Sequence, residues 1–360
     1  MTAPAQDTPL HGRLVQQIAR SGPMTIADFM ATCLLHPDHG YYSTRTPIGS
    51  SGDFITAPEI SQMFGEMLGL ALAQAWMDQG APDRVILAEL GPGRGTLMAD
   101  ILRTIRAVPA FAAAAQVHLV EASQTLAAQQ AEVLKEHTPT WHDAVQDPPE
   151  DAPLFLVANE FFDALPIRQF IRDGAGWRER QIGLETGALA FGLSEAAPLA
   201  MLEHRLEDTR DGDLVELCPS ARPIMAQIGQ RISRNGGAAL IFDYGDWRAL
   251  GDTLQAVRAH ETVGPLETPG AADLTAHVDF EALVTDLPCA HSRLATQGTV
   301  LERLGITQRA QTLAKGLSGA ALETHIAAHR RLTHPDEMGT VFKSIALFAK
   351  DAPPPPGYQT

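Results

Sequence analysis

The sequence has few basic residues, few cysteines and no long apolar run. Its 27 lysines and arginines stand against 43 aspartates and glutamates, which gives a formal net charge of -16. Because phosphate neutralisation needs clustered basic side chains, we expect no nucleic-acid partner. No apolar run approaches the roughly 20 residues that cross a bilayer, so we expect no transmembrane segment. The chain has 360 residues, and 45% of them are apolar. This length and composition are enough for one large globular domain or two smaller ones.

The three cysteines, Cys33, Cys218 and Cys289, lie far apart and show no spacing typical of a metal site. We therefore expect reduced thiols and no bound metal. The first residues, MTAPAQDTPLHGR, lack a basic segment followed by an apolar one, and they are poor in arginine. Neither a secretory signal nor a mitochondrial presequence is indicated, so we expect a bacterial protein of the cytoplasm.

From residue 84 onward, short apolar runs alternate with helical patterns. This alternation predicts an α/β fold, Rossmann-like, with a mainly parallel sheet covered by helices on both faces. The stretch from about 168 to 200 breaks the rhythm with short strands and Gly-rich turns, which indicates an antiparallel insertion. The expected strands are 85–90, 117–121, 154–158, 238–243, 292–296 and 342–348.

The sequence also predicts how the chain is divided. Residues 1–80 form an N-terminal helical extension, in which Thr56 and Glu59 stand at capping-box spacing and start one long helix. Gly65 and Gly69 on that helix indicate close packing against a neighbour. The main domain covers 81–350, with an inserted β-rich and helical segment at about 168–235. The Pro-rich residues 351–360 are expected to form a disordered tail.

The clearest motif is VILAELGPGRGT, an apolar strand that runs into alternate glycines at Gly91, Gly93 and Gly95 and then into a helix. Glycines at the carboxyl end of a strand let a ligand approach the backbone. Thr96 stands where a dinucleotide fingerprint needs glycine, and the GK[ST] of a P-loop is absent.

Acidic residues near this motif indicate which ligand it takes. Glu89 would repel a pyrophosphate but suits S-adenosylmethionine, which carries an ammonium and a sulfonium. Glu121 ends the next strand, where its carboxylate can accept hydrogen bonds from ribose hydroxyls, and Asp143, followed by Ala144, can accept one from the adenine amino group. The alternative is a tight strand-to-helix turn with solvated acids.

The segment that precedes the long helix is a further cofactor candidate. Gly52, Asp53 and Thr56 belong to a short stretch that could close over the cofactor as a lid. An ordinary Gly-Asp turn before a helix explains the same residues equally well.

Polar residues after the strand at 154–158 form the candidate substrate site. Asn159, Glu160 and Asp163 follow it directly, and in this fold that loop faces the transferred methyl group. Two carboxylates suit a cationic acceptor, and the planar guanidinium of arginine matches them. A carboxylate could also accept the proton that the nitrogen loses. The alternative is that these acids only cap a helix.

Three further residues are candidates for the same site. Asp243 and Tyr244 end another strand, and His260 adds an imidazole. His277 is a further polar candidate, and for both histidines the alternative is a purely structural role.

Several of these segments together resemble one family, the MidA-like methyltransferases. The resemblance covers nearly the whole chain. It implies a class I methyltransferase fold that binds S-adenosylmethionine, and its mitochondrial member dimethylates arginine symmetrically on a core subunit of NADH:ubiquinone oxidoreductase (complex I). The matching segments are GDFITAPEISQMFGE at 52–66, ELGPGRGTLMADILR at 89–103, VEAS at 120–123, NEFFDALP at 159–166, FDYG at 242–245, PGAADLTAHVDF at 269–280 and MGTVFKSIAL at 338–347.

The leading hypothesis is thus a protein arginine N-methyltransferase whose partner is a complex I subunit. Two alternatives stay open: a small-molecule methyltransferase, and an assembly chaperone that binds the cofactor without catalysis. The sequence leaves the oligomeric state, the acceptor and the degree of methylation open.

Overall fold

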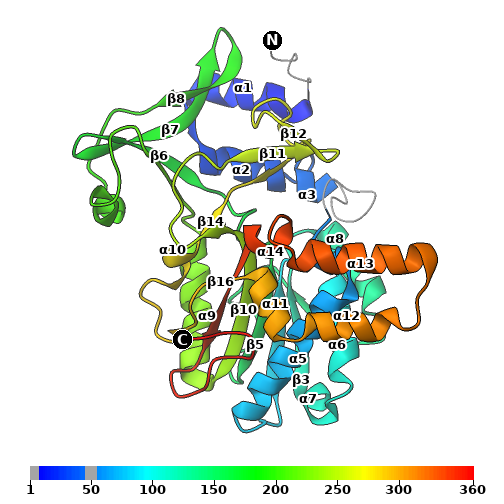
Figure 1. Cartoon of the computed structure of the whole chain (residues 1–360). Coiled ribbons are helices and arrows are strands. Elements are labelled where there is room, and N and C mark those ends of the chain that lie inside the picture. Colours follow the sequence, from blue (N-terminus) through cyan, green and yellow to red (C-terminus); the bar gives the residue numbers. More distant parts are fainter. Residues whose placement is uncertain (1–7, 45–54) are drawn as a thin grey trace.

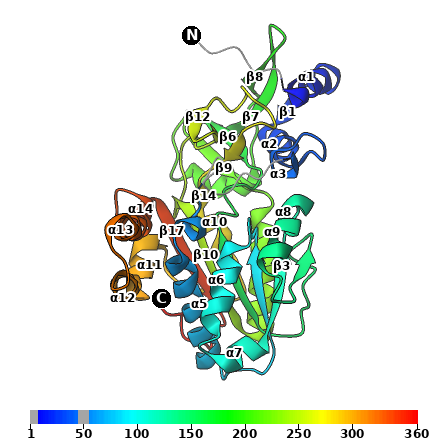
Figure 2. The same cartoon turned by 90° about the vertical axis from the view of Figure 1, so that its right-hand side faces the viewer.

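The computed structural model describes residues 8–44 and 55–360, which form two parts stacked one above the other. The lower part in Figures 1 and 2 is the main domain, a sheet with helices on both faces. The upper part, which we call the cap, consists of residues 8–44, 168–217 and 255–275. Its helices are α1 (Pro9–Ser21), α2 (Ile26–Leu35) and α3 (Tyr41–Thr44), and antiparallel strands pack beside them.

The main sheet has the strand order β15-β17-β10-β5-β2-β3-β4. From β10 to β4 the neighbouring strands are parallel, whereas β17 is antiparallel to β10. The order reverses between β2 and β5, and ligands of open α/β sheets bind at such a point, beyond the carboxyl ends of the strands. The strand bounds are β2 (Val85–Leu90), β3 (Ala115–Val120), β4 (Thr140–His142), β5 (Leu154–Asn159), β10 (Gly237–Asp246), β15 (Ala290–His291) and β17 (Phe342–Phe348).

The expected parallel sheet is confirmed, and every residue of β2 and β5 is buried, as in strands covered on both faces. One face carries α5 (Gln62–Asp78) and α6 (Thr96–Ile105), and the other carries α9 (Ala221–Asn235). A Cβ at Gly65 would lie 2.6 Å from the Cβ of Asp100, and one at Gly69 would lie 3.3 Å from the Cα of Ile101. The close packing expected of these glycines is confirmed.

The helix expected from Thr56 onward is interrupted. A short α4 (Ala57–Ile60) ends at Ser61, which is extended with φ -163° and ψ 136°, and α5 then begins with the Ser61 side chain accepting from the Met63 N–H. Thr56 makes no capping bond. The capping-box prediction is wrong because the Glu59 carboxylate is bound to the glycine loop instead.

The antiparallel insertion is confirmed, but its end is not where the sequence placed it. The strands β6 (Arg168–Asp173), β7 (Gly176–Glu185), β8 (Ala188–Leu193) and β9 (Leu214–Leu217) form one sheet with β1 (Met24–Thr25). The following helix, α9, packs on the main sheet, so the insertion ends near residue 217 rather than 235. The sequence did not predict a second insertion, which adds another sheet to the cap. Its strands are β11 (Gln255–Arg258), β12 (Glu261–Val263) and β13 (Asp273–Thr275).

Both ends of the chain also differ from the expected division. Within the predicted N-terminal extension, the described residues 8–44 belong to the cap, whereas α4 and α5 pack on the main domain. The prediction of a disordered tail at 351–360 is wrong. Tyr358 is 7% exposed, and its hydroxyl lies 2.5 Å from the hydroxyl of Ser344. The composition did not show that this segment is held by the buried Tyr358 ring and by hydrogen bonds from the Arg293 N–H to the Gln359 carbonyl and from Arg303 to the Gly357 carbonyl.

The strands that pair with β17, apart from β10, are short. The expected strand 292–296 is replaced by two brief ladders on β17, made by β15 and by β16 (Ala295–Thr296). Within the described residues, no helix is both long and apolar enough to cross a membrane. The remaining elements are α7 (Pro109–Ala114), α8 (Gln124–Val133), a 3-10 helix (Ala200–Leu206), β14 (Val278–Asp279), α10 (Phe280–Val284), α11 (Gln297–Arg303), α12 (Ile306–Ala314), α13 (Gly319–Thr333) and α14 (Met338–Val341).

Candidate active site and cofactor pocket

The glycine loop lies at the carboxyl end of β2 and leads into α6. Gly91, Gly93 and Gly95 have φ of 59°, 55° and 84°, the left-handed region that side chains disfavour. A Cβ at Gly91 would also lie 2.9 Å from the Phe161 ring. The alternate glycines are therefore required by the turn itself, in addition to the ligand approach that the sequence suggests.

Glu59 of α4 binds two residues of the glycine loop and of the start of α6. Its carboxylate accepts a hydrogen bond from the Thr96 hydroxyl and forms an ion pair of 3.2 Å with Arg94. Thr96 was a candidate cofactor ligand, but its hydroxyl is occupied by this contact. Thr56, Glu59 and Thr96 do line one small cavity together with Glu89 and the glycine loop.

Glu89 lies beneath the loop on β2 and is 3% exposed. Burial, reinforced by the charge of Glu121, raises the pKa of its carboxyl to about 8. Within the described residues, its Oε2 is buried without a hydrogen-bond partner. A buried carboxylate oxygen without a partner is costly, so this atom suits a cationic group of a bound ligand.

Glu121 follows β3 at the same edge of the sheet. Its Oε1 accepts from the Ser123 N–H at 2.7 Å, and its Oε2 accepts from Nε2 of Gln130 at 3.0 Å. Burial raises the pKa of this carboxyl, and the hydrogen bonds oppose the rise. These two hydrogen bonds hold the Glu121 carboxylate in place and leave further lone pairs on its oxygens. The lone pairs can accept from hydroxyl groups, as the predicted contact with the ribose requires.

The adenine side of the pocket is only partly defined. Asp143 is exposed and Ala144 half-buried, directly after β4, and the Ala144 N–H donates to Asp147 at 3.0 Å. Nothing in these contacts places a ligand beside Asp143, which stays a prediction. Asp53 lies outside the described residues.

The loop after β5 places the candidate catalytic carboxylates. Glu160 has φ 52°, an uncommon conformation for a residue other than glycine and one often found at functional sites. Its Oε1 accepts from the Ala57 N–H at 3.1 Å and from Asn159 Nδ2 at 2.8 Å. Burial first, and then the nearby charge of Asp163, raise the pKa of Glu160 to about 7.

Asp243 organises this loop from β10. Its Oδ2 accepts the backbone N–H groups of Phe161, Phe162 and Asp163 at 3.2, 2.9 and 3.2 Å, and its Oδ1 accepts from the Tyr244 N–H at 3.0 Å. The carboxylate is wholly buried. The geometry therefore gives Asp243 a positioning role and no free face for catalysis.

Asp163 and Tyr244 meet on the acceptor side. Asp163 is 6% exposed, and its Oδ1 has no hydrogen-bond partner within the described residues. Burial raises the pKa of Asp163, while a hydrogen bond from Tyr244 opposes the rise. The buried Asn159 also leaves its Oδ1 without a hydrogen-bond partner within the described residues, so acceptor oxygens from two side chains are open here.

Tyr42 of the cap reaches the same site, although the sequence gave no reason to select it. Its hydroxyl donates to the Asp273 carboxylate, 3.0 Å from either oxygen, and its carbonyl accepts from the Ser123 hydroxyl at 2.8 Å. Asp273 lies in the segment that resembles the family, which was the one available signal. The cap thus contacts the main domain next to Glu121, through Tyr42 and Ser123.

The two candidate histidines lie differently. His260 is exposed in the turn between β11 and β12, with φ 64°, and no described hydrogen bond joins it to Glu160, Asp163 or Asp243. The structure does not bring it to the site. His277 packs edge-on against Tyr244, with ring centroids 5.3 Å apart.

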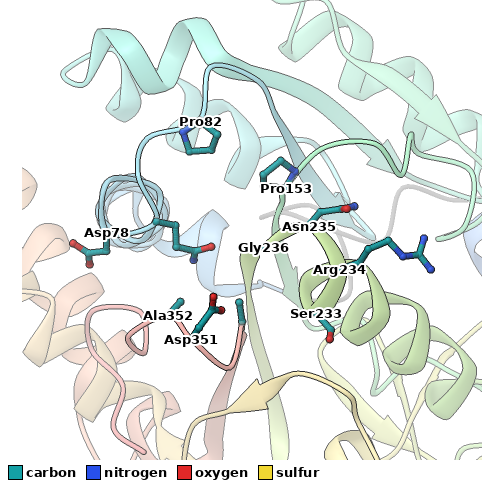
Figure 3. A pocket seen from close by; sticks show the side chains of 11 residues that line it. Asp78, Pro82, Pro153, Ser233, Arg234, Asn235, Gly236, Asp351 and Ala352 are labelled. Atoms are coloured by element: carbon teal, nitrogen blue, oxygen red, sulfur yellow. The ribbon is translucent and has the colours of Figure 1, made fainter.

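A larger cavity, of about 440 Å³, lies at the opposite end of the main domain (Figure 3). It is lined by the last turns of α5 and α9 and by the residues that precede β5 and β10. It therefore opens at the amino ends of the parallel strands, away from the glycine loop, and its Asp78 and Arg234 contact none of the residues described above. Among the described residues, no cluster of histidine, cysteine or carboxylate side chains could hold a metal ion.

These contacts form a pocket suited to a cationic nucleoside, and known proteins share its sequence and fold. Residues 67–300 match the family described as S-adenosyl-L-methionine-dependent methyltransferases. The mitochondrial protein arginine methyltransferase NDUFAF7 of Mus musculus is 37% identical over an alignment of 375 positions, which covers 95% of this chain and 85% of that protein. Its Homo sapiens counterpart is 36% identical, with 94% and 83% covered.

A solved structure agrees with these sequence relatives. A protein of Burkholderia thailandensis, assigned to the methyl transferases and bound to S-adenosyl-homocysteine, superposes with a TM-score of 0.82. It is 27% identical, and the match covers 97% of this chain and 94% of that one. When bound, S-adenosylmethionine supplies an electrophilic methyl group, and Glu89 and Glu121 are the acids that would hold it. This chain belongs to the S-adenosyl-L-methionine-dependent methyltransferases.

Proposed function

We propose that the protein methylates an arginine side chain of another protein, and that this acceptor is a complex I subunit modified during assembly. The observation that carries the proposal is the buried pair Glu160 and Asp163 at the carboxyl end of β5, with Asp163 Oδ1 open. The sequence relatives named above, which are protein arginine methyltransferases, support the same acceptor.

The chemistry of the pair fits a guanidinium. In the transfer, a nitrogen lone pair forms a bond to the methyl carbon, the carbon–sulfur bond breaks, and the nitrogen then loses a proton. Two carboxylates orient the planar cation, which fixes the attacking nitrogen in line with the sulfonium. Glu160, whose pKa is raised to about 7 by burial, is suited to accept the proton near neutral pH.

The test is transfer of labelled methyl to arginine-containing fragments of complex I core subunits. Glu160→Gln should reduce turnover by about 100-fold or more while cofactor affinity changes little, and Asp163→Asn should act in the same direction. Changing the target arginine to lysine should abolish transfer, because an ammonium lacks the planar fork.

A matched control is Glu216→Gln, which alters another buried glutamate, on β9 of the cap, 5% exposed. Its turnover should stay near the native value. Full activity in Glu160→Gln and Asp163→Asn would contradict the proposal. Transfer to small cationic amines but to no arginine peptide would instead identify a small-molecule methyltransferase.

We also propose that the protein works in a reducing compartment, the bacterial cytoplasm. All three cysteines are free, and burial raises the pKa of Cys33 to about 12 and that of Cys289 to about 11. Such thiols persist where disulfides do not form. Fractionation that finds the protein outside the cytoplasm would refute this.

A further inference from the structure

Three separate elements form the cofactor pocket, and one buried side chain contacts all of them. Gln130, on α8, is wholly buried. Its Nε2 donates to the Gly93 carbonyl at 2.8 Å and to Glu121 Oε2 at 3.0 Å. Its Oε1 accepts from the Trp141 indole N–H at 2.8 Å. The amide therefore connects the glycine loop, the acid after β3 and the strand β4.

The orientation of this amide follows from its partners. A carbonyl and a carboxylate accept only, while an indole N–H donates only. Nε2 must therefore face Gly93 and Glu121, and Oε1 must face Trp141. Both amide protons are used, and a flipped amide would lose all three bonds.

The backbone of α8 is fixed against the loop as well. A Cβ at Gly95 would lie 3.4 Å from the Cα and the Cγ of Gln130, which is close van der Waals contact. Both the Cα of Gln130 and its amide group therefore lie against the glycine loop. Any shift of α8 would move the Gln130 amide relative to Gly93 and Glu121.

From these contacts we infer that Gln130 is a positioning residue for S-adenosylmethionine. It sets the spacing between the glycine loop, the carboxylate of Glu121 and the strand that carries Trp141. Its bond to Glu121, together with the bond from the Ser123 N–H, also holds the carboxylate in place, and the remaining lone pairs face a ligand hydroxyl. The inference depends on the cofactor of the family and is independent of the arginine acceptor.

The test compares Gln130→Met with Gln130→Glu by calorimetry with S-adenosyl-homocysteine. Gln130→Met keeps the side-chain length and removes every hydrogen bond, so the Kd should rise about 10-fold to 100-fold. At saturating cofactor, kcat and the acceptor KM should stay within about 3-fold of native, because the acceptor carboxylates are untouched.

In Gln130→Glu, the loss of cofactor affinity should depend on pH, which a packing defect would not produce. It retains the acceptor for Trp141 but places a carboxylate against Glu121 and the Gly93 carbonyl. Relative to native protein at the same pH, its loss of affinity should be larger at pH 8 than at pH 5.5, where protonation relieves the repulsion.

Gln169→Met is the matched control. Gln169 is also wholly buried and also hydrogen-bonded at both ends of its amide, to Glu216, Asp252 and Arg180, but it lies in the cap. The inference predicts native cofactor affinity for this control. An unchanged Kd in folded Gln130→Met, or an equal rise in Gln169→Met, would overturn it. Trp141→Phe removes one of the three bonds, and it should raise the Kd measurably even if Gln130→Met fails to fold.

Discussion

Cofactor binding should depend on pH through Glu89. Burial raises the pKa of this carboxyl to about 8, so near neutrality it is mostly protonated in the free protein. A cationic ligand favours the carboxylate, so binding should release a proton. If only the ionised form binds, the competent fraction is about 1% at pH 6, about 9% at pH 7 and about 50% at pH 8.

The apparent affinity for S-adenosyl-homocysteine should therefore increase about 50-fold from pH 6 to pH 8, or about 2.3 kcal/mol. Calorimetry in two buffers of different ionisation enthalpy measures both the Kd and the protons released, expected to be about 0.9 per ligand at pH 7. Glu89→Gln should bind weakly and with little pH dependence.

Two variants separate Glu89 from its neighbours. Glu160→Gln should keep the pH dependence, since it does not remove the titrating group. Glu121→Gln should keep it with the midpoint at a lower pH, because the charge of Glu121 contributes to the raised pKa of Glu89. An affinity that is flat between pH 6 and pH 8 in native protein, or a slope that persists in Glu89→Gln, would refute the reasoning.

Three further predictions follow from other parts of the structure. Glu121→Ala should weaken cofactor binding by about 1.5–3 kcal/mol in calorimetry and leave the melting temperature without ligand nearly unchanged; a collapse of the fold would instead make Glu121 structural. His118 is 6% exposed, and burial lowers its pKa to about 4, so the unfolded chain binds more protons below pH 6.5. Stability should fall by at most about 3 kcal/mol as the pH drops from 6.5 to 4, and His118→Asn in urea titrations should lack this component. Deleting residues 351–360 exposes the site of Tyr358 and should cost about 3 kcal/mol of unfolding free energy, whereas Tyr358→Phe should cost about 1 kcal/mol; equal stability of the deletion and the native chain would contradict the packing.

The elements that could be predicted are those whose pattern is local. An apolar run before glycines identified β2 and the loop after it. Glu89 lies near the end of β2, and Glu121 and Glu160 follow β3 and β5, strands whose ends meet at one edge of the sheet. Three alternate glycines permit the left-handed backbone that the loop adopts, and this local pattern made the loop recognisable without its surroundings.

Features that depend on distant contacts could not be predicted. Glu59 stands at the spacing of a capping box, but its carboxylate binds Arg94 and Thr96, and no local pattern shows that competition. In the sequence, Gln130 looks like any other helical residue, because its three hydrogen-bond partners come from other parts of the chain. His260 was selected by residue type alone, and the hairpin that carries it belongs to the cap.

The strand that covers the edge of β10 is β17, which comes last among the described strands. It pairs with β10 from Ala238 to Tyr244, about a hundred residues earlier in sequence. While the chain is being synthesised, β10 therefore has an unpaired edge until residues 342–348 have emerged, and unpaired edges invite pairing with other chains. A variant that weakens the docking of β17 should expose this edge again and make the folded main domain prone to aggregate.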